Sequence, residues 1–217
     1  MKNILFCISL ALSFTAFGKD LPNVPENCFS DKVYCSNWEV ITDTELKKFI
    51  RINFFAELSS DFFKSYQDIE NQYMNFTQWP AFAEGSNSIK ISLSQLVDKG
   101  TGPDGRPYLS HQANYLIRGP APVNWVKVRE ITNYQKIPEV GNAVSSWAFD
   151  LKKDNPELEG VKGKKGELHI TFNQEKNVYL IYVVVDIYPS ISILHKLAAP
   201  CMESGFVSMF LGMFDLK

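Results

Sequence analysis

Few residue patterns in this sequence are typical of catalysis. The three histidines, His111, His169 and His195, lie far apart, so none forms the H-E-x-x-H pair of a zinc hydrolase. No serine stands in the G-x-S-x-G turn of an α/β-hydrolase. The glycines of residues 100–105 belong to a Pro-Asp-Gly loop and do not open a helix, as a phosphate-binding loop would. We therefore predict no metal site, no cofactor and no catalytic residue.

Acid–base chemistry is the one reaction class that the remaining polar residues would support. A cyclase or hydratase needs an acid or base whose pKa is shifted inside a cavity. The candidates for that role are Arg129, Tyr134, Tyr182 and Asp186. Whether the chain is an enzyme therefore stays open at this point.

Aromatic and methionine side chains are better suited to holding an apolar molecule. Aromatic residues make up 13% of the chain, and methionine suits adaptable apolar surfaces. A binding pocket has apolar walls and a few polar groups that orient the ligand. The predicted ligand-binding residues are Trp79, Trp125, Arg129, Trp147, Tyr182, Leu194, Met202, Phe206 and Met209.

Two alternatives stand beside this hypothesis. The same aromatic and methionine side chains would also suit an ordinary packed core, with an exposed aromatic surface that docks a protein partner. Trp125 shares one strand face with Lys127 and Arg129, so that face is either exposed to solvent or a cavity wall with charged anchors.

The elements that would position these residues follow from hydrophobic periodicity. Thr42 and Glu45 have the spacing of a capping box, which predicts a short helix with Phe49 and Ile50 on its apolar face. A strand at 52–58 and a helix that begins near residue 61 follow, and an aromatic helical segment ends near Pro80. Alternation then predicts further strands at residues 89–94, 113–118, 123–132, 145–151, 168–172 and 178–187, with the charged segment 154–166 as a surface loop.

Apolar residues at three- and four-residue steps predict one long C-terminal helix after Pro189, kinked or restarted at Pro200. An antiparallel sheet with a long helix on one face is an α+β architecture. If the twisted sheet bends around this helix, it leaves a cavity between them, lined by the helix and by the inner face of the sheet.

Two segments carry a family resemblance. Residues 58–68, LSSDFFKSYQD, with Trp79-Pro80 further on, are similar to the first strand and opening helix of the START-like (SRPBCC, helix-grip) superfamily, and residues 188–200, YPSISILHKLAAP, resemble the start of its C-terminal helix. The resemblance covers residues 50–217 and leaves residues 19–49 as an added N-terminal arm. It implies a helix-grip fold and a hydrophobic small molecule or lipid as the partner, but no particular ligand.

The N-terminus predicts export. Lys2 precedes an uncharged run at 4–17, and Ala16 and Gly18 are the small residues expected before a cut at Lys19. The run is shorter than the roughly 20 residues of a membrane-spanning helix, so we predict a cleaved signal peptide over residues 1–18 rather than an uncleaved anchor. The mature chain would be periplasmic or extracellular.

Loss of Lys2 with the signal peptide would leave 21 basic residues (22 minus 1) against 24 acidic ones, a net charge of −3. This weak acidity argues against a nucleic-acid partner and against docking on anionic lipid. In an oxidising compartment Cys28 and Cys35 are expected to close a short disulfide loop, while the apolar surroundings of Cys201 predict a buried thiol. The sequence does not specify the oligomeric state.

Overall fold

The computed structural model describes residues 21, 23–30, 32–45, 47–119, 125–152, 161–190 and 195–216, without the side chains of residues 195 and 197. The predicted signal peptide and Leu194, one of the predicted ligand-binding residues, lie outside the described residues.

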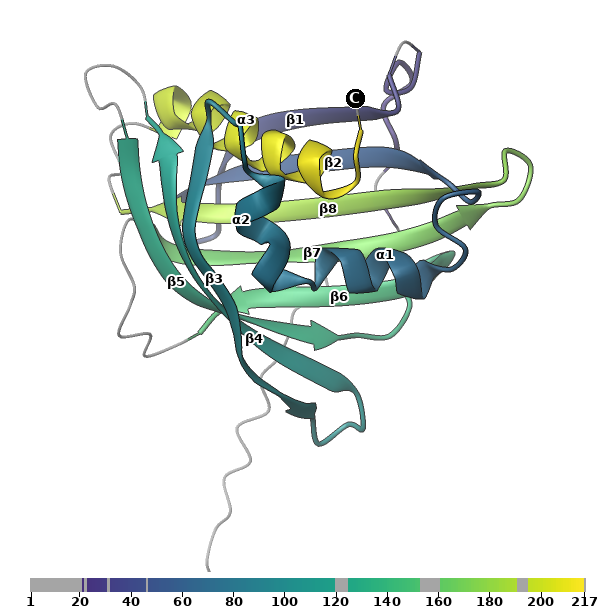
Figure 1. Cartoon of the computed structure of the whole chain (residues 1–217). Helices are drawn as coiled ribbons and strands as arrows, with labels where there is room; N and C mark the ends of the chain where they lie inside the picture. The colour runs from purple at the N-terminus through teal and green to yellow at the C-terminus, as the bar shows by residue number, and fades with distance from the viewer. Residues whose placement is uncertain are drawn as a thin grey trace, which may run out of the picture.

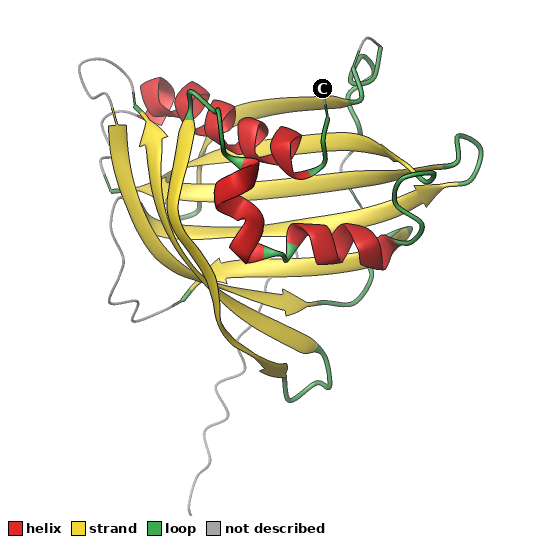
Figure 2. Cartoon of the chain, in the orientation of Figure 1, coloured by secondary structure: helices red, strands yellow, loops and turns green. Residues whose placement is uncertain are grey.

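An eight-stranded antiparallel sheet forms the body of the molecule, in the order β1-β2-β8-β7-β6-β5-β4-β3. Its strands are β1 (Tyr34–Thr42), β2 (Lys48–Ser59), β3 (Ile89–Thr101), β4 (Pro107–Arg118), β5 (Trp125–Lys136), β6 (Ala143–Leu151), β7 (Val161–Asn173) and β8 (Val178–Pro189). The helices are α1 (Tyr66–Tyr73), α2 (Trp79–Phe82) and α3 (His195–Met213), with a 3₁₀ turn at Phe76–Gln78. All three helices lie on one face of the curved sheet (Figures 1 and 2), which confirms the predicted α+β helix-grip architecture.

The core lies between the sheet and α3, because strand alternation directs apolar side chains to the helix. On β8, Ile181, Val183, Val185 and Ile187 are all at most 3% exposed. The ring of Phe54 on β2 stacks on Phe210 of α3, with 4.6 Å between the ring centres. The helix runs through Pro200 without a break. No helix in the described part of the chain is long and apolar enough to cross a membrane.

The predicted helix after Thr42 is wrong, because this segment is a β-hairpin. Strands β1 and β2 pair from Tyr34↔Ala56 to Thr42↔Lys48, so residues 34–42 and 48–49 of the predicted N-terminal arm belong to the sheet. The Asp43 side chain accepts hydrogen bonds from the backbone N–H groups of Glu45 and Lys47, at 2.9 and 2.8 Å. An Asp side chain that bonds to the following backbone favours a turn, and the pairing of β2 with both neighbours then overrides the local helix signal.

The next helix begins later than predicted. Ser65 caps it, four residues after the predicted start near residue 61, and the side chain of Asp68 completes the capping box. Residues 60–62 form a turn, which leaves Phe62 72% exposed.

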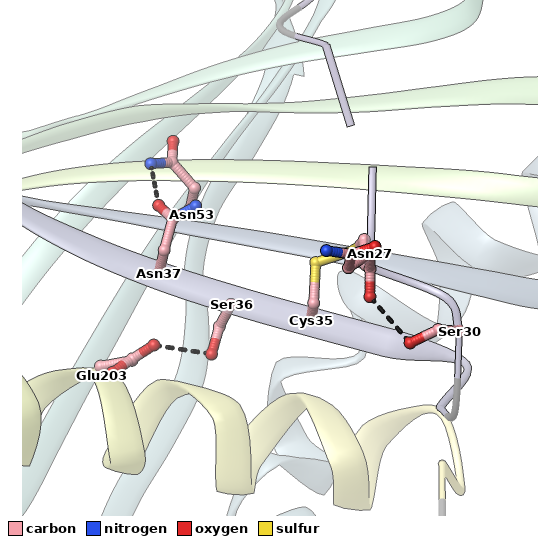
Figure 3. The surroundings of a disulfide bond; sticks show 8 residues. Asn27, Ser30, Cys35, Ser36, Asn37, Asn53 and Glu203 are labelled. Atoms are coloured by element: carbon pink, nitrogen blue, oxygen red, sulfur yellow. Dashed lines mark hydrogen bonds between the residues drawn. A yellow bond between two sulfur atoms is a disulfide. The ribbon is translucent and has the colours of Figure 1, made fainter. Parts of the chain in front are cut away.

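A disulfide fastens the chain before β1 to the edge of the sheet. Cys28 and Cys35 are bonded as predicted, with their Cα atoms 5.2 Å apart. One residue further along β1, the Ser36 hydroxyl donates a hydrogen bond to Glu203 of α3 at 2.7 Å (Figure 3). The disulfide therefore lies where the edge strand meets the C-terminal helix. Cys201, on the same helix, is half-buried rather than buried.

Candidate ligand-binding cavity

An apolar cavity lies between the inner face of the sheet and α3. Its walls include Ile117, Val128 and Ile187 from the sheet and Met202, Phe206 and Met209 from the helix. The cavity volume is about 40 Å³, which holds a few water molecules at most. Pockets that enclose drug-sized ligands are closer to about 300–1,000 Å³. A larger molecule would therefore require the cavity to expand.

One ion pair is buried in this apolar wall. Lys164 of β7 binds Glu130 of β5, and the two side chains are only 8% and 2% exposed. The Thr132 hydroxyl also donates to the Glu130 carboxylate at 3.3 Å. Removing two charges from water costs several kcal/mol per ion, and an apolar pair of similar volume is often as stable. Apolar residues of similar volume at these two positions would therefore give the fold at least similar stability.

Three tyrosines surround the ion pair. Burial raises the pKa of Tyr73, Tyr115 and Tyr134, and the nearby Glu130 carboxylate raises the pKa of Tyr115 and Tyr134 further. Tyrosine hydroxyls are neutral at physiological pH even without such a shift, so these three serve as hydrogen-bond donors or acceptors. Together with Glu130 and Lys164 they make a polar end in a cavity whose other walls are apolar.

His111 is buried beside this polar end. It is 0% exposed and stacks on Phe76, with 4.1 Å between ring centres. The Ser94 hydroxyl donates to the Phe76 carbonyl at 2.6 Å, so His111 Nε2, 2.8 Å from Ser94 Oγ, carries the proton of the neutral ring. Its Nδ1 has no hydrogen-bond partner among the described residues. Burial lowers the pKa of His111 well below 6.5, and the positive charge of Lys164 lowers it further.

This lowered pKa predicts a loss of stability in acid. The unfolded chain takes up a proton on His111 near pH 6.5 and the folded chain does not, so the contribution to stability is present above that pH and is lost as the pH falls. We expect His111→Phe to reduce the dependence of the unfolding free energy on pH by up to about 1.4 kcal/mol per pH unit below pH 6.5. Urea unfolding of both proteins at several pH values measures this slope. Equal slopes for His111→Phe and the unaltered protein would contradict a lowered pKa of His111 in the folded state.

Only some of the predicted ligand-binding residues line the cavity. Trp79, Met202, Phe206 and Met209 line the cavity. Trp147 is also buried in the core, but its indole N–H donates to Glu70 of α1 at 2.9 Å, away from the cavity lining.

Three further predicted residues lie on the outer face of the sheet. Trp125 and Arg129 alternate with Val126, which packs against the core, and with Val128 and Glu130, which line the cavity. The same alternation on β8 places Tyr182 outside, where its hydroxyl donates to Asn53 at 3.0 Å. These three residues do not line the cavity, because alternate residues of a strand face opposite sides.

Of the residues considered for acid–base chemistry, only Tyr134 reaches the cavity. Asp186 lies on the outer face and binds Arg51 of β2 at 2.7 Å.

Sequence reasoning missed Glu130, Lys164 and the position of His111. Lys164 lies in a run that predicted a solvated loop, but β7 begins at Val161 and pairs with β8 through this run. Glu130 carried a usable signal, since it follows Val126 and Val128 at two-residue steps. His111 stands in the middle of β4 and faces the core instead of a loop.

Solved structures of other proteins resemble this chain. No protein-family model matches the chain, and no curated protein matches its sequence. Among solved structures, it resembles TTHA0849, a protein from Thermus thermophilus, at 12% identity and a TM-score of 0.47, over 76% of this chain and 93% of that one. It also resembles a START superfamily protein from Mycobacterium smegmatis at 14% identity and a TM-score of 0.45, over 76% and 97% of the two chains. The third is human STARD10, at 9% identity and a TM-score of 0.47, over 81% and 69%.

Proposed function

We propose that the protein is exported and binds or carries a hydrophobic small molecule, such as a lipid or an isoprenoid, between the sheet and α3. The apolar part of the ligand would contact Met202, Phe206 and Met209. A polar group at one end would exchange hydrogen bonds with Glu130 and Lys164. Burial of apolar ligand surface would drive binding, at about 25 cal/mol per Å².

The observation that carries this proposal is the buried ion pair inside an otherwise apolar cavity. Lys164 and Glu130 satisfy each other in the closed form. A ligand with a hydroxyl, carbonyl or carboxyl group would replace part of these hydrogen bonds at little cost, because the desolvation of the two charges has already occurred on folding. An apolar core alone would not select one end of a ligand in this way.

Opening would require movement of α3 or of the loops at residues 100–107 and 138–143, since the cavity is small. Polar contacts of this helix among the described residues include Ser36, which donates to Glu203, a hydrogen bond of 2.6 Å between Ser88 and Ser204, and Gln72, which donates to the Met213 carbonyl at 2.8 Å. Most of its attachment is apolar, and a bound apolar ligand would replace such contacts.

An enzyme remains a second candidate because of the same polar cluster. Glu130 lies in a buried cavity with Lys164, Tyr115 and Tyr134, and charged groups in such surroundings are common at active sites. A cyclase or hydratase would show turnover of the bound molecule, whereas a carrier releases it unchanged.

A tryptophan scan of α3 tests the binding site. We expect Met209→Trp to weaken binding of a fluorescent fatty acid more than tenfold, because the larger ring fills a cavity of about 40 Å³ and blocks its enlargement. Titration by fluorescence measures the affinity, and circular dichroism verifies folding. Met202→Trp serves as a second variant if the first does not fold.

The control is Tyr182→Phe, which removes a hydroxyl from the outer face and should bind with the affinity of the unaltered protein. The location of the site would be contradicted if Met209→Trp and Met202→Trp both bound with the affinity of the unaltered protein. The proposed function would be contradicted if the unaltered protein bound no apolar probe.

A further inference from the structure

Three neighbouring strands bring basic side chains and a tryptophan together on the outer face of the sheet. Lys90 of β3, Arg118 of β4 and Lys127 of β5 are exposed. Trp125 and Leu116 are 37% and 36% exposed. Register places Leu116 between Lys90 and Lys127, and places Arg118 opposite Trp125. These five residues are called the β3–β5 patch below.

The β3–β5 patch is positively charged, although the whole chain has a net charge of −2. The strand segments that contribute to it, residues 90–92, 114–118 and 125–129, contain no aspartate or glutamate. Lys90 Nζ lies 4.9 Å from the centre of the Trp125 ring, so a cation and an amphipathic ring share one site. Glu84, in the turn after α2, borders the same surface hollow as Lys90 and is a nearby carboxylate outside these strands.

The β3–β5 patch lies on the reverse side of the cavity wall. Ile89, Ile117 and Val128 line the cavity, and each is the sequence neighbour of a basic residue of the patch. Figure 1 shows the start of β3, the end of β4 and the start of β5 beside the N-terminal end of α3. Met202, in the first half of that helix, and Phe206, just past its middle, line the cavity. A surface that the patch contacts would therefore lie next to one end of the binding site.

We propose that the β3–β5 patch docks the protein on an anionic lipid surface. Clustered lysines and arginines are attracted to negatively charged lipid headgroups, and tryptophan prefers the interface between headgroup and acyl chain. The net acidity of the chain predicted the opposite, but salt screens charges beyond about 8–10 Å, so the charges nearest the membrane dominate. This docking is separate from the identity of the cargo and does not require a membrane anchor.

Vesicle sedimentation of the mature chain tests the proposal. We expect binding to phosphatidylcholine vesicles that contain phosphatidylglycerol, and little binding to phosphatidylcholine alone or in high salt. Each basic residue near the surface contributes about fivefold in affinity, so charge reversal by Lys90→Glu or Arg118→Glu should weaken binding about 25-fold. Lys90→Gln should lose about fivefold, and Trp125→Ala should also reduce binding.

The matched control is Lys99→Glu, an exposed lysine at the other end of β3, which should leave vesicle binding unchanged. Circular dichroism and the fluorescent fatty-acid titration establish that the variants fold and keep their cavity. Equal binding to neutral and anionic vesicles, an equal loss in Lys99→Glu, or no vesicle binding by the unaltered chain would each overturn the docking proposal without affecting the proposed cargo site.

Discussion

Replacing Lys164 with methionine should lower the free energy of unfolding by about 3–5 kcal/mol, because it leaves Glu130 as a buried carboxylate without its counter-charge. Lys164 is 8% exposed and Glu130 2% exposed, so water does not compensate for the loss. Methionine keeps the length and apolar volume of the lysine stem, which limits the contribution of a cavity. Urea unfolding at neutral pH measures the effect.

The double variant Lys164→Met/Glu130→Leu separates the ion pair from packing. It should recover most of the stability, since replacing both members of a buried pair by apolar groups is often neutral or stabilising. Lys162→Met is the matched control: Lys162 is exposed two residues earlier on β7, and its replacement should change stability by less than about 0.5 kcal/mol. A loss below about 1 kcal/mol for Lys164→Met would contradict a buried, mutually dependent pair. If the double variant folds but no longer binds the fluorescent fatty acid, the ion pair is required for ligand binding and not for stability.

Gly212→Ala should destabilise the contact between α2 and α3 by about 2 kcal/mol in spite of the higher helix propensity of alanine. A Cβ atom at this position would lie well inside 3.0 Å of the Phe82 carbonyl oxygen, a separation that real Cβ atoms essentially never show. Phe82 ends α2, so either the short helix or the end of α3 would have to shift. Thermal or urea unfolding gives the magnitude.

Gly205→Ala is the control on the same helix. Its Cβ atom would lie 3.5 Å from the Ser88 carbonyl oxygen, an ordinary van der Waals contact. It should therefore be neutral or stabilising by up to about 1 kcal/mol, the usual gain of Gly to Ala inside a helix. Equal effects at the two positions would mean that close packing at Phe82 does not hold the end of α3.

The sheet and the last helix could be predicted because their patterns are strong and local. Alternation marked six strands from residue 89 onward, and apolar residues at helical spacing marked α3. The strand predicted at 52–58 lies within β2, but β1 and the turn that joins it to β2 could not be predicted in the same way. Thr42 and Glu45 match a helix cap, and only the pairing of β1 with β2 shows that the segment is a hairpin.

The candidate site could be predicted only in part, for the same reason. Helical spacing identified Met202, Phe206 and Met209, which line the cavity. Trp125 shared its face with Lys127 and Arg129, and the sequence alone left that face as either a wall or a surface. The partner of Glu130 is 34 residues further along the chain, in a run of lysines and glycines that resembles a loop. A contact between residues so far apart depends on strand order, which local periodicity does not contain.

Native mass spectrometry of the mature protein purified from its own host, followed by organic extraction, tests the central claim most directly. The proposed function predicts one discrete apolar species with a polar end group, in near-stoichiometric amount, and its loss from Met209→Trp. An empty protein that also fails to bind a panel of lipids would contradict the cavity as a binding site. The enclosed residues would then be an ordinary core, and the function would lie on the surface as a protein-interaction domain.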